Sequence, residues 1–371
     1  MKKGKVIVVA LAVLGMGLLV MMGCQTKEVT SAKVYIQQDD WDKAIEQLEL
    51  AVKAYPNDPE AHYLLGEGYS MKRWFARMNE QFDASLKISP KFANQVESTR
   101  EKFWVNHFNS GVGKINAGKV EDSITDFKTC LVIDPKKPEA YKNLAFSFIK
   151  AQKPDSAIAV YQTALTLSPK DTVIMTSLGT LYYEKKEYQK VIDIYQRLHE
   201  VEPNNVAAIA NIALAYDQMG QSDKAFEMYQ TALAVNPEDK DLIFNLGRLY
   251  YLKGDFEKAI EQFTKVLQAD PNDYDSNLNT GNAYLSIADK KRKEAVDLEE
   301  KSGDKAKNQI SQLVQEMLDN FAKAVPYLEK ATELKPENAL AWQNLGVAYV
   351  NTGMKEKGEA AFEKAEELSK K

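Results

Sequence analysis

AIANIALAYDQMGQSDKAFEMYQTALAVNP at residues 208–237 is followed by LIFNLGRLYYLKGDFEKAIEQFTKVLQADP at residues 242–271. Both stretches carry the same pattern, and the second copy comes 34 residues after the first. The pattern is a small residue, an aromatic residue three positions on, an alanine, a further aromatic residue and a closing proline. Its positions are Ala213, Tyr216, Ala225, Tyr229 and Pro237 in the first copy, and Gly247, Tyr250, Ala259, Phe263 and Pro271 in the second. A fixed period of this length predicts a repeated structural unit.

Each copy predicts two amphipathic helices, because apolar residues recur every three or four positions in two blocks. Gly220 and Gly254 stand where the first helix of each copy ends, and glycine accepts the left-handed backbone that stops a helix. Close packing of two antiparallel helices requires small side chains, so we expect Gly247 to face Ala259. The closing prolines lack the N–H group that would continue the second helix.

This pattern resembles the tetratricopeptide repeat (TPR), and the last copy, with Trp342, Leu345, Gly346 and Tyr349, matches the signature of that family in full. The small position of the first helix is Gly or Ala in nine copies: Ala32, Gly66, Gly111, Ala145, Gly179, Ala213, Gly247, Gly281 and Gly346. The resemblance implies an all-α, right-handed TPR solenoid of nine helix pairs. In the second helix of the ninth repeat, Gly358 replaces the usual alanine, which predicts looser packing of that helix pair.

The repeats are predicted to occupy residues 24–371, near 25–58, 59–92, 104–137, 138–171, 172–205, 206–239, 240–273, 274–338 and 339–371. Two intervals contain insertions. Ala93 to Phe103 lengthens the junction between the second and third repeats. The larger insertion, at about 286–323, has helical spacing and one break near Gly303, which predicts a protruding helical hairpin in repeat eight. A disordered charged loop is the alternative, and Pro326 is expected to kink the returning helix.

Residues 1–23 form a predicted signal peptide, with Lys2, Lys3 and Lys5 before an apolar run from Val6 to Met22. Gly23 before Cys24 resembles the processing site of bacterial lipoproteins, which implies lipidation at Cys24 and a membrane-anchored lipoprotein of the bacterial cell envelope, facing the periplasm or lying on the outer surface. An uncleaved transmembrane helix and ordinary secretion are the alternatives.

Composition and motifs argue against an enzyme. Loss of the three leader lysines changes the formal net charge from −5 to −8, the charges are mixed, and we expect no nucleic-acid partner. The three histidines lie far apart in the repeats, and no metal-binding, phosphate-binding or nucleophile motif occurs. We therefore predict no catalytic residues, metal, cofactor or small-molecule substrate. Cys130 replaces an alanine of the repeat and is expected to be a buried small hydrophobic residue.

One row of polar residues suggests a binding function. Two positions before the small residue of the first helix, six repeats carry asparagine: Asn109, Asn143, Asn211, Asn245, Asn279 and Asn344. The resemblance implies that this position lies on the concave face, where an asparagine row holds an extended polypeptide in some TPR proteins. A carboxamide offers an acceptor and two donors, which complement a peptide bond of any sequence. Simple solvation of these asparagines is the alternative.

Other positions expected on this face include Tyr63, Phe108, Phe146, Tyr183, Phe244 and Tyr251, with more acidic than basic side chains. We therefore expect a partner segment that is extended, somewhat apolar and basic. The sequence thus predicts a membrane-anchored scaffold that binds other proteins. A structural spacer that self-associates, and a module that binds glycan or peptidoglycan, are the alternatives.

Overall fold

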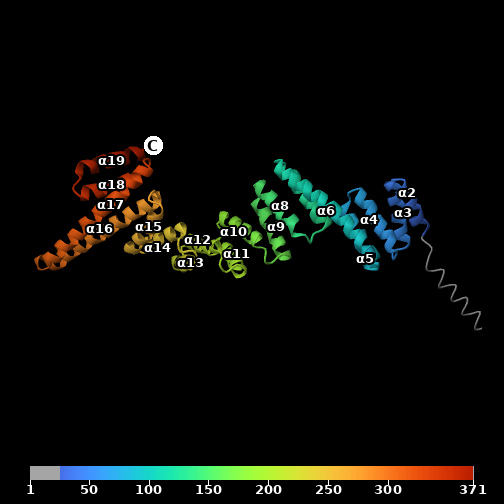
Figure 1. The fold of residues 1–371 in the computed structure, drawn as a ribbon, viewed down its shortest axis with the longest axis horizontal. Coiled ribbons are helices and arrows are strands. Elements are labelled where there is room, and N and C mark those ends of the chain that lie inside the picture. Colours follow the sequence, from blue (N-terminus) through green and yellow to red (C-terminus); the bar gives the residue numbers. More distant parts are fainter. Residues whose placement is uncertain (1–25, 371) are drawn as a thin grey trace, which may run out of the picture. The chain divides into compact units, whose positions relative to one another are not determined.

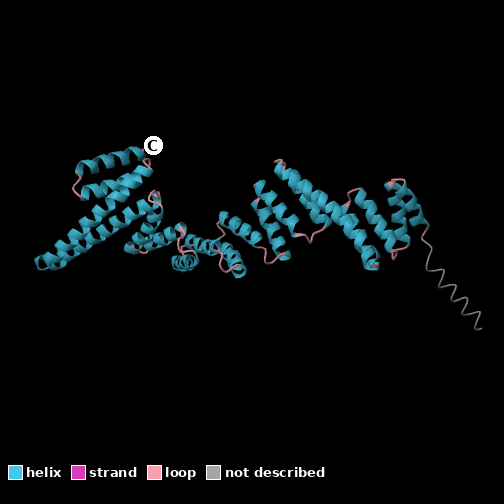
Figure 2. Ribbon diagram, viewed as in Figure 1, coloured by secondary structure: helices cyan, strands magenta, loops and turns pink. Residues whose placement is uncertain are grey.

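The computed structural model describes residues 26–370, apart from the side chains of residues 303 and 304, and the predicted leader with Cys24 lies outside this range. The described residues form eighteen α-helices joined by short turns (Figures 1 and 2). Contacts divide the chain into two compact units that meet between Ile174 and Met175, inside helix α10. Among residues 26–370, no helix combines the length and the apolar character that crossing a membrane requires.

In unit 1, the helices are α2 (Lys27–Gln37), α3 (Trp41–Ala54), α4 (Pro59–Met71), α5 (Phe75–Ile88), α6 (Ala93–Asn116), α7 (Val120–Ile133), α8 (Pro138–Lys150) and α9 (Pro154–Leu167), with a 3-10 turn η2 (Pro90–Phe92) before α6. The first insertion continues helix α6 at its amino-terminal end. In each successive pair, the first helix has an even number and the second helix has an odd number.

In unit 2, the helices are α10 (Thr172–Glu184, shared with unit 1), α11 (Tyr188–Val201), α12 (Val206–Gln218), α13 (Ser222–Val235), α14 (Lys240–Leu252), α15 (Phe256–Ala269), α16 (Tyr274–Ser302), α17 (Lys307–Leu334), α18 (Ala339–Asn351) and α19 (Lys355–Ser369). The 3-10 turn η3 (Gly303–Ala306) joins α16 to α17. The predicted all-helical solenoid is confirmed.

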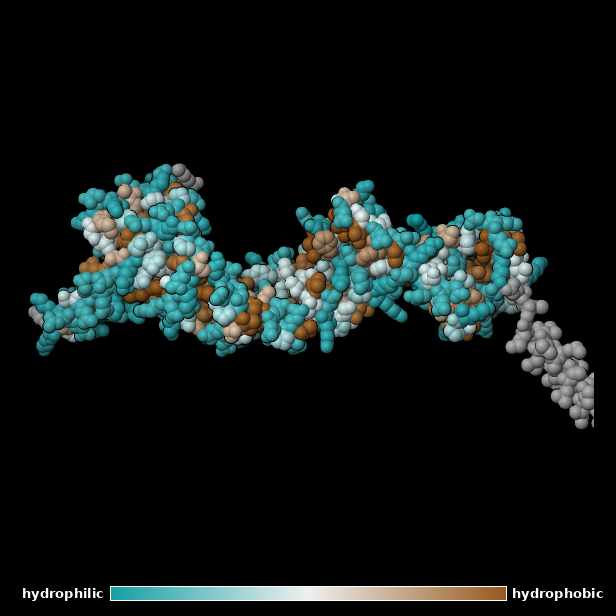
Figure 3. Space-filling view, in the orientation of Figure 1, coloured by the Kyte–Doolittle hydropathy of each residue, from teal (hydrophilic) through white to brown (hydrophobic). Residues whose placement is uncertain are grey.

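The predicted hairpin in repeat eight is also confirmed. Helices α16 and α17 run antiparallel, and their far end projects beyond the neighbouring helices of unit 2 (Figure 1). Most of the surface at this end is hydrophilic (Figure 3). At its base the hairpin is anchored by Phe321, Ala324 and Leu328, all of which are buried. Helix α17 continues through Pro326.

The turn between the two helices of a pair needs a residue in the left-handed region. Gly220 and Gly254 have φ values of 71° and 79°, as the sequence predicted. In other pairs a residue with a side chain, such as Arg73 at φ 60°, takes the same place and accepts the strain.

The small residue of the first helix lies against an aromatic ring of the second helix. A Cβ atom added at Gly247 would lie 2.8 Å from the Phe263 ring, and one added at Gly111 would lie 2.8 Å from the Phe127 ring. The glycine therefore makes room for the aromatic side chain of the second helix. Both rings are fully buried in the core between the two helices.

The prediction of a looser last pair is wrong. A Cβ atom added at Gly358 of α19 would lie 2.5 Å from Val350 Cγ2 of α18, so the glycine lets these helices approach more closely.

Two glycines of α6 provide a matched test of this packing. Gly111→Ala places a methyl group against the buried Phe127 ring, whereas no atom lies within 4 Å of a Cβ at Gly113. We expect Gly111→Ala to destabilise unit 1 by about 1–2 kcal/mol, because overpacking outweighs the gain in helix propensity. Gly113→Ala should stabilise it by about 0.5–1 kcal/mol. Denaturant titration followed by circular dichroism measures both, and equal shifts of the same sign would contradict the packing described here.

Candidate functional site

Four of the six predicted asparagines bond to their own helices. The Nδ2 groups of Asn143, Asn211, Asn245 and Asn279 each donate to the main-chain oxygen four residues earlier, at 2.7–2.9 Å. Their Oδ1 atoms make no hydrogen bond with another described residue. Asn109 is exposed and makes no hydrogen bond within the described part of the chain. These bonds within one helix lie at the surface, so a ligand can replace them at little cost.

The asparagines fall into two groups. Asn109 and Asn143 belong to unit 1, on α6 and α8. Asn211, Asn245, Asn279 and Asn344 belong to unit 2, where they occupy the same position on the successive first helices α12, α14, α16 and α18. We call the surface formed by these four residues the asparagine face.

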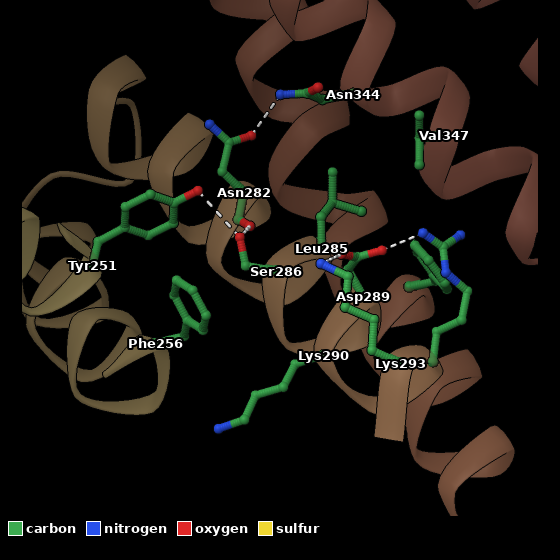
Figure 4. A pocket seen from close by; sticks show the side chains of 12 residues that line it. Tyr251, Phe256, Asn282, Leu285, Ser286, Asp289, Lys290, Lys293, Asn344 and Val347 are labelled. Atoms are coloured by element: carbon green, nitrogen blue, oxygen red, sulfur yellow. Dashed lines mark hydrogen bonds and ion pairs between the residues drawn. The ribbon is translucent and has the colours of Figure 1, made fainter. Parts of the chain in front are cut away.

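Asn344 differs from the other three because it bonds across helices. Its Nδ2 donates to Oδ1 of Asn282 on α16 at 2.7 Å (Figure 4). The Nδ2 group of Asn282 and the Oδ1 atom of Asn344 then have no partner among the described residues. The pair thus presents a free donor and a free acceptor, the two groups that a peptide backbone requires.

This pair lies at the edge of a pocket of about 580 Å³ at the base of the hairpin. The pocket is lined by α14, α15, α16, α17 and α18, with side chains from Tyr251, Phe256, Asn282, Leu285, Ser286, Asp289, Lys290, Arg292, Lys293, Phe321, Asn344 and Val347 (Figure 4). Of the predicted binding residues, only Asn344 reaches it. Polar groups converge here over an apolar wall, as in other ligand-binding clefts.

One wall of the pocket is fixed by a chain of hydrogen bonds. The Ser286 hydroxyl donates to the main-chain oxygen of Asn282 at 2.9 Å. Its oxygen therefore accepts from the Tyr251 hydroxyl, which lies 3.1 Å away. The Tyr251 ring packs edge-on against Phe256 with ring centres 5.2 Å apart. These contacts tie the end of α14 to α16, so the wall is preformed.

The pocket is basic, which differs from the acidic groove expected from the sequence. Asp289 contacts both Arg292 and Lys293, the latter at 2.9 Å. The hydrogen bond from Lys293, together with the charge of Arg292, holds the pKa of Asp289 below its usual value. Lys290 makes no hydrogen bond or ion pair within residues 26–370, and its ammonium group extends away from α16 (Figure 4). Two positive charges therefore remain in excess.

Several acidic side chains of the first helices are paired within the protein. Glu60 contacts Lys33 at 2.7 Å, and Asp217 contacts Arg248. Glu67 accepts a hydrogen bond from the Thr99 hydroxyl at 2.5 Å. Because these carboxylates are already paired, they attract a basic partner less strongly than the same number of unpaired carboxylates would.

Most aromatic residues expected in the groove pack within the protein. Tyr63 stacks on Phe92 with ring centres 4.6 Å apart, and Phe108 stacks on Trp104 at 4.7 Å. Phe244 packs against Phe263, and Tyr183 against Tyr188. Phe146 is the one exposed ring of the six, at 40% of its surface, and the other five are partly buried. Exposed stacking platforms are therefore few on these helices.

A Ser–Asp–His cluster in unit 1 lacks the geometry of a nucleophilic triad. Ser110 Oγ donates to Asp126 Oδ2 at 2.6 Å, and His107 Nδ1 lies 2.9 Å from Asp126 Oδ1. The serine is thus bonded to the carboxylate rather than to an imidazole base. Burial alone would raise the pKa of Asp126, but hydrogen bonds from Lys114, Ser110 and His107 hold it below its usual value.

Cys130 is fully buried, which confirms the expected packing role, and burial raises the pKa of its thiol to about 12. Within residues 26–370, no three His, Cys, Asp or Glu side chains are placed to hold a metal ion.

Sequence reasoning missed the residues that α16 contributes to the pocket. Lys290 to Lys293 form a run of four basic residues in a chain whose charges are otherwise mixed. That run, with Asn282 and Ser286 at four-residue spacing before it, was the available signal. Asn282 comes directly after Gly281, the small residue of its repeat. The corresponding residue of the preceding repeat is Arg248.

Family comparisons match most parts of the chain. Models described as tetratricopeptide repeat match residues 148–213, 211–274, 313–338 and 339–371, and one described as TPR repeat matches residues 32–72. The chain is a tetratricopeptide repeat protein. The TPR family and the fold support a scaffold for protein–protein interaction, and members of this family are typically non-enzymatic. The comparison with curated proteins gave no match.

Several solved structures are similar to parts of this TPR chain. A crystal structure of MamA protein has 25% identity and a TM-score of 0.42, covering 45% of this chain and 92% of its own. Pseudomonas aeruginosa PilF has 20% identity and a TM-score of 0.45, with coverages of 67% and 98%. YrrB, described as a TPR protein with an unusual peptide-binding site, has 19% identity and a TM-score of 0.42, with coverages of 50% and 95%.

Proposed function

We propose that this TPR protein is a membrane-anchored scaffold of the cell envelope that binds extended polypeptide segments on the asparagine face. The observation that carries this proposal is the Asn282–Asn344 pair, with its free Nδ2 and free Oδ1 beside a preformed pocket. Asn211, Asn245 and Asn279 continue the same chemistry along the neighbouring first helices.

Recognition through carboxamides suits a scaffold that tolerates different partner sequences. Each Asn can accept from one backbone N–H and donate to one backbone carbonyl, and neither bond depends on the partner's side chains. The exposed bonds that Asn211, Asn245 and Asn279 make to their own helices satisfy the donors when no partner is bound. Replacing these bonds by bonds to a partner therefore costs little free energy. The affinity for the partner comes from several weak contacts made together.

The anchor rests on the sequence of residues 1–24, which lie outside the described range. Its position agrees with the start of the fold, because Thr26, two residues after Cys24, already caps helix α2. The Thr26 hydroxyl accepts a hydrogen bond from the Val29 N–H at 3.3 Å. Lipidation at Cys24 would therefore hold unit 1 close to the membrane surface with almost no linker.

Selection from random peptides tests the binding proposal. The mature chain, purified in detergent, is presented with displayed random twelve-residue peptides. We expect enriched peptides that are unstructured when free and bind at micromolar to millimolar concentrations, as shallow backbone recognition suggests. Chemical shift changes in the side-chain amides of the asparagine face should accompany binding. Absence of any enriched peptide would overturn the proposal.

A further inference from the structure

We propose that the turn between α4 and α5 binds an anionic lipid surface, with the Trp74 side chain entering the interfacial layer while Arg73 and Arg77 contact lipid phosphates. We call residues 71–77 the tryptophan turn. This inference goes beyond the proposed polypeptide binding and does not depend on it. It concerns a surface of unit 1, away from the asparagine face.

The tryptophan turn exposes two large apolar side chains that are close in sequence. Trp74 is 46% exposed and Met71 is 48% exposed. The other three tryptophans of the chain are buried or half-buried. Tryptophan concentrates at the boundary between lipid and water, because its ring is apolar and its N–H group is polar. An exposed tryptophan on a turn is therefore suited to a membrane surface.

The repeat itself does not require these residues. Trp74 is the N-cap residue of α5, but its side chain makes no capping hydrogen bond. Arg73 has a positive φ, at a place where four other pairs carry glycine without strain. The N-cap residue of the second helix is polar in six other repeats: Asp40, Lys119, Lys153, Glu187, Gln221 and Asp255. The fold leaves Arg73 and Trp74 unexplained, whereas a binding role accounts for both.

Two arginines of the turn carry charges that no acidic side chain pairs with. Arg73 and Arg77 are exposed, and neither makes an ion pair within residues 26–370. The Arg77 guanidinium lies over the Trp74 ring, 5.3 Å from the ring centre, which keeps the two side chains together. Basic side chains near an anionic bilayer each strengthen binding to it. The turn thus joins an interfacial ring to two free positive charges.

The acidic residues of the preceding turn do not cancel these charges. Asp40 pairs with Lys43 and Asp42 pairs with Lys72, each at 2.7 Å. Residues 38–43 and the tryptophan turn together contain three Asp against four Lys and Arg, a formal net charge of +1. An anionic surface is therefore attracted to this end of the repeats rather than repelled.

The shape of the site favours lipid over glycan. An open hollow of about 470 Å³ is lined by Trp74, Phe75, Ala76 and Arg77. None of these four side chains has an oxygen that could accept a hydrogen bond from a sugar hydroxyl. A ring and a guanidinium without acceptors match a lipid interface, where the available groups are acyl chains and phosphates.

The proposed lipidation at Cys24 would supply a second attachment for the same unit. Helix α4 has 13 residues and runs in the same direction as α2, so its end lies about 20 Å from the level at which α2 begins. Both attachments are made when α4 lies along the membrane surface. Two attachments hold a protein to a membrane more firmly than one.

Vesicle binding by the unlipidated chain tests this inference. The mature chain with Cys24→Ser, made without its leader, is mixed with vesicles of equal parts phosphatidylglycerol and phosphatidylethanolamine and separated by flotation. We expect it to float with these vesicles, and to bind phosphatidylcholine vesicles at least about fivefold more weakly. Binding should weaken at high salt. Lipids brominated on the acyl chains should quench the fluorescence of Trp74.

The variants use residues that other repeats carry at the same positions. Gln221 corresponds to Trp74, and Gln152, with a φ of 58°, corresponds to Arg73. Trp74→Gln should lower the vesicle partition coefficient at least about fivefold and remove the quenching, because its apolar surface is lost. Arg73→Gln/Arg77→Gln should lower the coefficient at least about tenfold, because two charges are lost.

Matched controls lie at the other end of the second helices. Tyr55 follows α3 and is 47% exposed, so Tyr55→Gln removes an equally exposed ring. Lys53 and Lys87 are exposed in the last turns of α3 and α5, so Lys53→Gln/Lys87→Gln removes the same charge. Both controls should bind vesicles as the unsubstituted chain does. Circular dichroism checks that all variants keep their helix content.

Three results would overturn the lipid surface. These are no flotation of the unsubstituted chain, equal flotation of the turn variants, and an equal loss of binding in the controls. Binding to purified peptidoglycan that Trp74→Gln removes, without flotation, would assign the turn to glycan instead. None of these results bears on the asparagine face, which peptide selection tests separately.

Discussion

Replacing Asn211, Asn245 and Asn279 together by alanine should weaken binding of a selected peptide by a factor of about 30 to 1000. Each lost hydrogen bond to a ligand costs about 0.5–1.5 kcal/mol, which gives roughly 2–4 kcal/mol for the three. The melting midpoint should change little, because the amides bond only to their own helices at the surface. Alanine is also the better helix former.

A control asparagine on the hairpin separates binding from helix effects. Asn320 on α17 makes the same kind of bond, donating to the Glu316 oxygen at 2.7 Å, but it lies off the asparagine face. Asn320→Ala should leave affinity unchanged. If the triple variant also keeps its affinity, the asparagine row is no binding device. If the triple variant melts at lower temperature, these asparagines stabilise the repeats instead.

Replacing Cys24 by serine should abolish lipidation and leave a precursor that retains its leader. The reason is chemical, because only a thiol can form the thioether that carries the diacylglycerol. Incorporation of a labelled fatty acid and the intact mass of the protein measure the result. Several acyl chains hold a protein to a membrane far more firmly than one, so the variant should also lose its lipid-based attachment.

The second cysteine provides the control for this experiment. Cys130 is fully buried between helices of unit 1, so Cys130→Ser should keep the label. Label on the Cys24→Ser variant would show that the lipid is attached elsewhere and would remove the lipoprotein interpretation. An unlabelled native chain would do the same.

Local signals in the sequence were sufficient to predict the helices. The left-handed turns at Gly220 and Gly254 could be predicted because glycine adopts a positive φ without strain. The hairpin followed from helical spacing between Ile310 and Phe321, which a disordered loop would not show. Each of these features depends on residues close together in the chain, so a single sequence is enough to find them.

Contacts between helices were harder to predict. The sequence identified Gly247 as a position of close packing but not which side chain would come closest to it, which is the Phe263 ring. The looser last pair predicted from Gly358 was wrong, because helix α18 packs closely into the space beside this glycine. The space beside a small residue can be filled by an aromatic ring or by the backbone of a neighbouring helix. Which of the two fills it depends on side-chain directions, which the repeat pattern does not contain.

The pocket depends on a contact between two adjacent repeats whose contacting residues lie far apart in the sequence. Asn282 and Asn344 are 62 residues apart, with the whole hairpin between them. An alignment of the repeats shows that Asn344 belongs to a row of asparagines. It does not show that the Asn344 amide bonds to Asn282, a residue of α16 that the preceding repeat lacks. The sign of the pocket's charge was also hidden, because Lys291 and Lys293 are close in sequence but contact Glu316 and Asp289 on different sides of α16.

Site-specific photo-crosslinking tests the central claim that polypeptides bind on the asparagine face. A benzophenone amino acid is placed at Val347, which lines the pocket, or at Gln230, which is exposed on the second helix α13. The full chain with its leader is then irradiated in the cells that produce it. We predict discrete polypeptide adducts from position 347 that disappear in the Asn211, Asn245 and Asn279 triple alanine variant, and none from position 230. Adducts from position 230 alone, or adducts from position 347 that survive the triple variant, would contradict this account.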